Sequence, residues 1–309
     1  MKLSSARDLK QQIRELYGSS QGHGGTGIAV GIATNHREYR VAVRVRVSLP
    51  AHVKAEIEKI TRGEVDIRVT GEIKAWPAKE PIPRTPLAIG SSIGHCRSTG
   101  AGTLGFFAQR IADGAMGIVS NNHVLAIEDG GGEGDEILCP GPADHGESPG
   151  DVVAHLAGDY PRLQEKGPTA DCAFARLVEG VPYDPLALGP EQRLSPTPAP
   201  ADVPHDVVEK IGRTTKRTQG MVTAFDLDEI DMDYSFGTTR FNDSIEVEST
   251  NDGPFASGGD SGSLVFNSDR QPLGLVYACS FRGGARNNGL TYLNPINSVL
   301  SALRVTFPS

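Results

Sequence analysis

The chain has 309 residues, of which 38% are hydrophobic and 22% charged, a balance typical of soluble globular proteins with one large domain or two smaller ones. The net charge is −8, and the arginines at 40–46 alternate with apolar residues like the solvated face of a strand, so no nucleic-acid partner is indicated. No stretch approaches the ~20 apolar residues that span a bilayer, and the N-terminus lacks a signal-peptide core, so we expect a cytoplasmic protein without membrane contact.

The first 86 residues predict a small α+β module. Apolar residues on one face indicate an amphipathic helix over residues 4–17, which a glycine-rich joint follows at 22–27. Apolar and alternating runs then predict elements in the order β-β-α-β. Their expected ranges are 27–34, 38–48, 50–62 and 65–76. Four prolines within residues 77–86 indicate a linker.

From about residue 87 the sequence consists of short β-like runs separated by glycine-rich turns. A second proline-rich stretch at 182–204 divides them into two groups. The pattern predicts two antiparallel six-stranded-type β-barrels, over about 87–181 and 205–309. A C-terminal helix is expected with Asn294 as its N-cap and Pro295 at its first position. The predicted fold class is therefore mainly β, with the N-terminal α+β module and a final helix added.

The four cysteines carry no metal or redox motif. Cys96, Cys139, Cys172 and Cys279 form no CxxC pair, and His95 beside Cys96 has no partner at ligand spacing. We therefore expect free thiols, no metal site and no cofactor.

The strongest chemical signal is the segment SGGDSGS at 257–263, which an apolar strand follows. A serine hydroxyl attacks a peptide carbonyl only when a base removes its proton and hydrogen-bond donors hold the oxyanion. Glycines near the serine allow backbone conformations that are closed to other residues. Ser261 is therefore interpreted as a nucleophile, and the amides of Gly259 and Ser261 as the oxyanion hole. An ordinary Gly-Asp-Ser-Gly turn is the alternative.

A base and an orienting carboxylate can be proposed for this serine. His123 ends one apolar strand and Asp171 begins another, although either residue alone is more often structural. With Ser261 they follow the order His, Asp, Ser. The separations allow His123 and Asp171 to lie on the first barrel and Ser261 on the second.

Over about residues 87–309 the chain resembles the chymotrypsin/trypsin-like serine protease family. The resemblance rests on a histidine motif (SNNHVL, 120–125), an aspartate motif (DCA, 171–173), a nucleophile motif (GDSG, 259–262) and a bacterial-type start of the second barrel (KIGRTT, 210–215). The segment 138–142 and the N-terminal module are similar to a bacterial and plant intracellular subgroup with an added N-terminal region. The resemblance implies a two-barrel serine endopeptidase with a His123, Asp171 and Ser261 triad.

Two departures from the family pattern concern activation and specificity. No activation site precedes the first barrel, so Asp260 needs a partner other than a newly formed N-terminus. Phe255 falls where trypsins carry the acid that binds Lys or Arg. With Tyr277, Ala278 and Cys279 as the pocket wall, it predicts an apolar substrate-binding pocket for an uncharged side chain.

The predicted function is a serine endopeptidase that forms an acyl-enzyme with protein or peptide substrates. One alternative is a catalytically silent protease-like binding module, occluded by the N-terminal helix or the glycine-rich joint. The other is a serine esterase, although the G-x-S-x-G elbow and Ser-Asp-His order of α/β-hydrolases are absent. Strand edges in the N-terminal module are expected to allow homo-oligomer formation.

Overall fold

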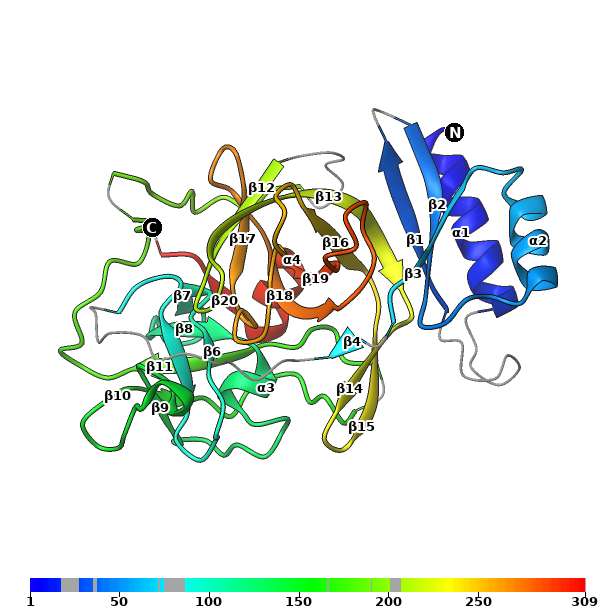
Figure 1. Ribbon diagram of the computed structural model, residues 1–309. Coiled ribbons are helices and arrows are strands. Elements are labelled where there is room, and N and C mark those ends of the chain that lie inside the picture. The colour runs from blue at the N-terminus through cyan, green and yellow to red at the C-terminus, as the bar shows by residue number, and fades with distance from the viewer. Residues whose placement is uncertain are drawn as a thin grey trace.

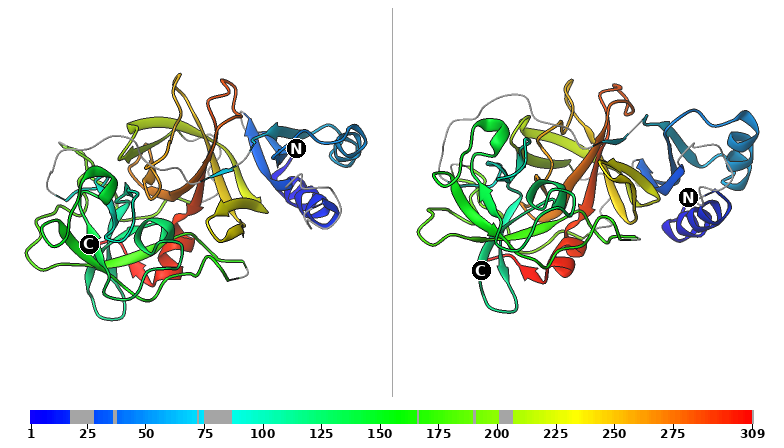
Figure 2. Two further views of the ribbon diagram at one scale, coloured as in Figure 1. Left: turned by 60° about the horizontal axis from the view of Figure 1, so that its bottom comes forward. Right: turned by 90° about the horizontal axis from the view of Figure 1, so that it is seen from below.

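The computed structural model describes residues 1–17, 28–35, 38–71, 73–74, 87–165, 167–189, 191–200 and 207–308. Within these ranges the chain forms an N-terminal α+β module, a curled sheet (barrel one) and a closed barrel (barrel two) (Figure 1). The module lies on one side of barrel two, and the C-terminal end lies beside barrel one (Figure 2). No helix in these ranges is both long and apolar enough to cross a bilayer.

The N-terminal module has the predicted order of elements. They are α1 (Leu3–Tyr17), β1 (Ile28–Asn35), β2 (Glu38–Val45), α2 (Ala51–Ile60), β3 (Val65–Val69) and the short β4 (Ile73–Lys74). The apolar faces of both helices pack on β1 and β2, with Ile13 and Ile57 fully buried against Val41 and Val43. Within the range 65–76, where one strand was predicted, the described residues form two strands, β3 and β4. The joint at 22–27 and the linker at 77–86 lie outside the described residues.

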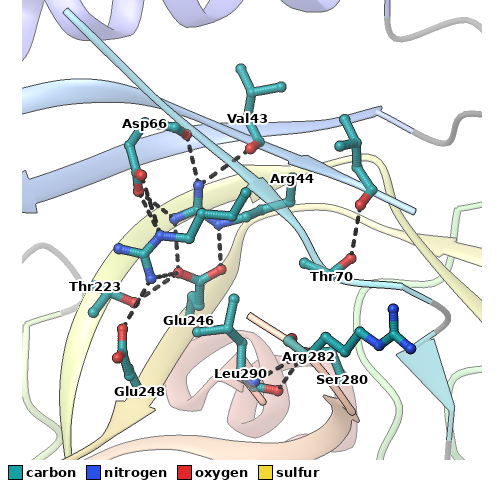
Figure 3. Close-up of polar contacts among 12 residues, drawn as sticks. Val43, Arg44, Asp66, Thr70, Thr223, Glu246, Glu248, Ser280, Arg282 and Leu290 are labelled. Atoms are coloured by element: carbon teal, nitrogen blue, oxygen red, sulfur yellow. Dashed lines mark hydrogen bonds and ion pairs between the residues drawn. The ribbon is translucent and has the colours of Figure 1, made fainter. Parts of the chain in front are cut away.

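One expectation for this module is wrong. Arg44 was placed on a solvated strand face, but it is only 1% exposed. It extends from β2 to Glu246 of barrel two, where Nε lies 2.6 Å from Oε2 (Figure 3). Arg44 is buried because barrel two covers this face of the strand and supplies a buried carboxylate that pairs with the guanidinium.

Barrel one is an antiparallel sheet in the order β20-β7-β8-β11-β10-β9-β5-β6. Its strands are β5 (Ser92–His95), β6 (Gly102–Thr103), β7 (Phe106–Arg110), β8 (Met116–Ser120), β9 (Glu136–Leu138), β10 (Val152–Leu156), β11 (Ala173–Leu177) and β20 (Val305–Thr306). The short helices α3 (Asn122–Leu125) and η1 (Pro142–Asp144) interrupt its loops. Buried side chains such as Phe106, Ile118 and Phe174 fill its core.

Barrel two is a closed ring of strands. It runs through β12 (Val207–Gly212), β13 (Lys216–Asp228), β16 (Ser244–Ser249), β19 (Thr291–Pro295), β18 (Pro272–Ser280) and β17 (Leu264–Asn267), which pairs again with β12. The hairpin of β14 (Ile230–Tyr234) and β15 (Gly237–Phe241) projects from this ring toward barrel one (Figure 1).

The final helix, α4 (Ile296–Leu303), begins later than predicted. Asn294 belongs to β19, and Pro295 takes the N-cap position without a side-chain hydrogen bond. The side chain of Asn294 is engaged elsewhere, because its Oδ1 accepts a hydrogen bond from the backbone nitrogen of Asp171 at 2.9 Å. It therefore supports the opposite barrel and does not cap α4.

The module and barrel two share one continuous sheet. β1 pairs antiparallel with β13, with Ile32 opposite Phe225 and Ala33 opposite Ala224. The short β4 pairs antiparallel with β18 and parallel with β14. Backbone hydrogen bonds therefore cross the boundary that the sequence places near residue 86.

Candidate active site

His123 and Asp171 meet at the end of two paired strands of barrel one. His123 lies in α3 directly after β8, and β8 pairs with β11, with Ser120 opposite Ala173. This register places Asp171 beside the histidine. His123 Nδ1 lies 2.5 Å from Asp171 Oδ2, and the backbone nitrogen of His123 donates to Asp171 Oδ1 at 3.3 Å. The carboxylate thus holds both the ring and the backbone of the histidine.

Asp171 is fully buried, and it is supported by three residues that the sequence did not assign to the site. Asn121 Nδ2 donates to the carbonyl of Asp171 at 2.7 Å, and Asn294 Oδ1 accepts from its nitrogen. The hydroxyl of Tyr234 donates to Asp171 Oδ2 at 2.8 Å. Of these three residues, only Asn121 could have been linked to the site from the sequence, because it lies in the histidine motif, two residues before His123.

The electrostatics of the pair suit a general base. Burial by itself disfavours the charged imidazole, but the carboxylate of Asp171, with a contribution from Glu128, outweighs it and raises the pKa of His123. A raised pKa means that His123 binds a proton more readily than a free imidazole does. It can therefore take the proton of a nucleophile and keep it while a bond forms.

Ser261 lies in a tight loop before β17. Gly259 and Gly262 have φ values of +91° and +89°, in the region that favours glycine. A Cβ at Gly262 would lie 2.0 Å from Ser120 Oγ and 2.5 Å from the Thr103 carbonyl. Thr103 holds the loop from barrel one, with its nitrogen donating to the Ser261 carbonyl and its Oγ1 to the Gly259 carbonyl, both at 2.8 Å.

The histidine helix and the serine loop touch the same glycine. A Cβ at Gly102 would lie 2.5 Å from a methyl of Val124, the residue after His123, and 3.0 Å from the Ser261 carbonyl. Both segments therefore meet on β6. The described residues include no hydrogen bond between Ser261 Oγ and His123, a contact that often forms only when substrate binds.

The backbone nitrogens of Gly259 and Ser261 are the predicted oxyanion donors. Within the described part of the chain, the backbone nitrogens of Gly259 and Ser261 donate to no protein acceptor, whereas the neighbouring nitrogen of Gly262 bonds the Val276 carbonyl at 2.8 Å. The nucleophile's own amide and the amide two residues before it are thus both available as hydrogen-bond donors, as an oxyanion hole needs.

Asp260 finds its partners inside barrel two. It is fully buried, and Lys210 Nζ lies 3.5 Å from its Oδ2. The carboxylate also accepts from Thr215 Oγ1 at 2.6 Å and from the nitrogens of Thr214 and Ser257 at 2.8 and 3.0 Å. The pKa of Lys210 is lowered by burial, which Asp260 opposes. Lys210 is therefore the charged partner of Asp260, in place of a newly formed N-terminus.

The predicted pocket residues occupy different environments. Tyr277, Ala278 and Cys279 follow Val276 on β18, beside the serine loop. The Tyr277 ring is buried, with its hydroxyl 2.9 Å from Ser244 Oγ, while Cys279 is half-buried. Phe255 is 2% exposed and packs in the core of barrel two. It remains a prediction that these four residues bind substrate.

Comparison with known proteins identifies the fold. No family model and no curated protein matches the chain. The solved structure of a glutamic acid specific serine protease is 21% identical and covers 72% of this chain and 100% of its own, with a TM-score of 0.51. The Nocardiopsis protease NAPase is 19% identical and covers 73% and 100%, with a TM-score of 0.50. This chain has the chymotrypsin-like serine protease fold.

The chymotrypsin-like fold confirms the predicted mainly β class and the two-barrel arrangement. Barrel two is the closed barrel, and barrel one is a curled sheet with an open path. The segments that carry His123 and Ser261, one from each barrel, approach the same residue of β6, Gly102.

Proposed function

We propose that the protein is a serine endopeptidase in which Ser261 is the nucleophile, His123 the general base and Asp171 the orienting carboxylate. The observation that carries the proposal is the buried contact of 2.5 Å between His123 and Asp171. The helix that carries His123 and the Ser261 loop both approach Gly102 of β6, and this loop has two backbone amides without a protein acceptor among the described residues. The chymotrypsin-like fold supports hydrolysis of peptide bonds in protein substrates.

The proposed reaction is acyl transfer. Ser261 Oγ attacks the scissile carbonyl carbon while its proton passes to His123 Nε2, and Asp171 stabilises the imidazolium. The amides of Gly259 and Ser261 hold the oxyanion. The intermediate collapses when His123 gives the proton to the leaving amine, which leaves an ester on Ser261. Water, deprotonated by His123, then attacks the ester carbon, and His123 returns the proton to Ser261 Oγ as the acid product leaves.

The finer features of the proposal concern substrate and compartment. An apolar pocket next to Phe255 and β18 would favour an uncharged side chain before the cleaved bond. All four cysteines are free. Free thiols suit the reducing cytoplasm that the sequence indicates.

The second candidate is a catalytically silent binding module. It is favoured by the missing hydrogen bond between Ser261 and His123, and by β4, which pairs with the β18 edge at Cys279 and Ser280, beside the predicted pocket wall. Such a module would hold the triad residues without turnover.

Labelling with a fluorophosphonate probe separates these candidates. The intact chain should form a covalent adduct, and Ser261→Ala and His123→Ala should abolish it because nucleophile or base is lost. Ser263→Ala is the matched control, since this serine lies two positions away and its hydroxyl has no partner among the described residues. A folded chain that stays unlabelled would favour the binding module, and cleavage of esters without peptides would favour an esterase.

A further inference from the structure

A second donor reaches Asp171 from barrel two. Tyr234, the last residue of β14, places its hydroxyl 2.8 Å from Asp171 Oδ2, the oxygen that His123 Nδ1 also contacts. Asp171 is fully buried and Tyr234 is 8% exposed. An ionised carboxylate only accepts hydrogen bonds, so the phenol donates. The negative charge on Oδ2 is thus shared between two donors.

The ring of Tyr234 is held by aromatic neighbours. It stacks on Phe236 with centroids 5.4 Å apart and an interplanar angle of 5°. The ring of Phe241 lies edge-on at 6.4 Å, and the imidazole of His123 is tilted against it at 6.2 Å. Because packing fixes the ring, the hydroxyl has little freedom to leave the carboxylate.

The hairpin that carries Tyr234 is anchored to barrel one at two residues that follow Tyr234. The nitrogen and hydroxyl of Ser235 both donate to Glu128 Oε2, the nitrogen at 2.8 Å. Thr239 Oγ1 donates to the Leu163 carbonyl at 2.9 Å. The hairpin therefore spans the contact between the barrels and carries one hydroxyl to the triad carboxylate.

The ionisable groups that act on His123 and Asp171 come from both barrels. Glu128 is the second carboxylate that acts on His123. Beside Asp171 lie Cys172 from barrel one and Tyr277 from β18, and burial raises the pKa of both, as it does that of Tyr234. The phenol of Tyr234 is therefore protonated, and able to donate, at every pH where His123 titrates.

We propose that Tyr234 is a positioning residue, whose hydroxyl fixes the Asp171 carboxylate against His123 and takes up part of its negative charge. The inference rests on the proposed serine peptidase function. Without the hydroxyl, Oδ2 would have one donor fewer and would attract the imidazole proton more strongly. The carboxylate would also be less firmly oriented, so His123 would be a poorer partner for Ser261.

Tyr234→Phe tests the proposal because it removes only the hydroxyl. The fluorophosphonate labelling rate should fall roughly ten- to a hundredfold, the effect of losing a hydrogen bond to a charged group. The acid limb of the labelling rate should move to higher pH, because the pKa of His123 should rise. Tyr292→Phe is the matched control, since its buried hydroxyl has no hydrogen-bond partner among the described residues. Its labelling rate and pH profile should match those of the intact chain.

A second readout does not depend on activity. Nuclear magnetic resonance in a Ser261→Ala background should give a higher pKa for His123 after Tyr234→Phe, over a titration from about pH 5 to 8. An unlabelled intact chain would end the peptidase proposal, yet this titration would still decide the role of Tyr234. An unchanged His123 titration would overturn the inference, as would lower stability with no change in labelling rate.

Discussion

At the scale of single residues, the buried pair of Lys210 and Asp260 is the feature most sensitive to change. Both side chains are fully buried, and the carboxylate organises the nitrogens of Thr214 and Ser257 around the serine loop. Lys210 Nζ also donates to Thr215 Oγ1 at 2.5 Å. Loss of either charge leaves the other buried without its counter-ion.

Lys210→Met should therefore lower the free energy of unfolding by about 3–5 kcal/mol, the usual cost of breaking a buried ion pair from one side. Denaturant unfolding would measure it. Arg7→Met is the control, because Arg7 pairs with Asp226 at the surface and should change stability by about 1 kcal/mol or less. Equal effects of the two substitutions would contradict a special role for the buried pair.

The proposed base gives a pH prediction with a definite sign. Only neutral His123 accepts the Ser261 proton, so activity rises as pH passes upward through the pKa of His123. Since that pKa is raised above the ordinary 6.5, the acid limb of the labelling rate should lie above pH 6.5. An acid limb at lower pH in the intact chain would contradict this assignment.

Asp171→Asn should remove the charge that raises the His123 pKa and move the acid limb downward. It should also slow acylation on the order of 10⁴-fold, as loss of the triad carboxylate does in established serine proteases. Measuring the labelling rate across pH separates the two effects, and an acid limb left in place would argue that Asp171 does not control His123.

His123, Asp171 and Ser261 could be proposed as a triad from the sequence because each stands in a short local motif. The residues that support Asp171 were not predictable in the same way. Tyr234 and Asn294 lie far along the chain, and a tyrosine or asparagine in an ordinary strand carries no sign of its target. Their roles arise only when the barrels close against each other.

At the scale of elements, ion pairs tie the N-terminal module to barrel two. Arg44 of β2 contacts Glu246 of β16 and Asp66 of β3 (Figure 3). Arg68 lies 3.0 Å from Asp66 Oδ2 and 3.0 Å from Glu248 Oε2. Burial by itself raises the pKa of Glu246, but Arg44 and Arg68 outweigh it and hold the pKa below its usual range.

Arg44→Met should lower the free energy of unfolding by about 3–5 kcal/mol, because Glu246 would stay buried without its partner. Lys54→Met breaks an exposed pair with Glu58 on α2 and should cost about 0.5 kcal/mol or less. Denaturant unfolding of the two variants gives the comparison. A similar midpoint for both would contradict a structural role for the network.

The same network predicts acid sensitivity. A carboxylate with a depressed pKa in the folded state contributes stability that is present above its unfolded pKa and is lost as pH falls through the folded value. Glu246 should therefore destabilise the intact chain progressively below about pH 4.3. Unfolding midpoints across pH should fall less steeply in Glu246→Gln.

Alternation of apolar residues predicted the strands of the module but not what covers them. The pattern at residues 40–46 marks a strand, yet it cannot distinguish water from a buried carboxylate opposite Arg44. Tertiary packing decides what covers each face of a strand, and the alternation of residues along the strand does not encode it.

At the scale of the whole molecule, β1 of the module extends the sheet of barrel two through its pairing with β13. A chain that lacks residues 1–71 keeps β4 but exposes the β13 edge at Ala224 and Phe225 and deprives Glu246 of Arg44. We expect a lower unfolding midpoint and self-association through the open edge. Chemical denaturation and light scattering would measure both. A monomeric truncated chain with the intact midpoint would instead mark residues 1–71 as a dispensable addition.

The pairing of β1 with β13 also limits how such proteins can exchange parts during evolution. A gene that lost the segment encoding the module would leave Phe225 and Leu227 of β13 without Ile32 and Gly31, which they now contact. Descendants without the module should therefore carry charged residues, proline or a bulge along this strand. The module and the strand it covers are expected to be inherited, and to change, together.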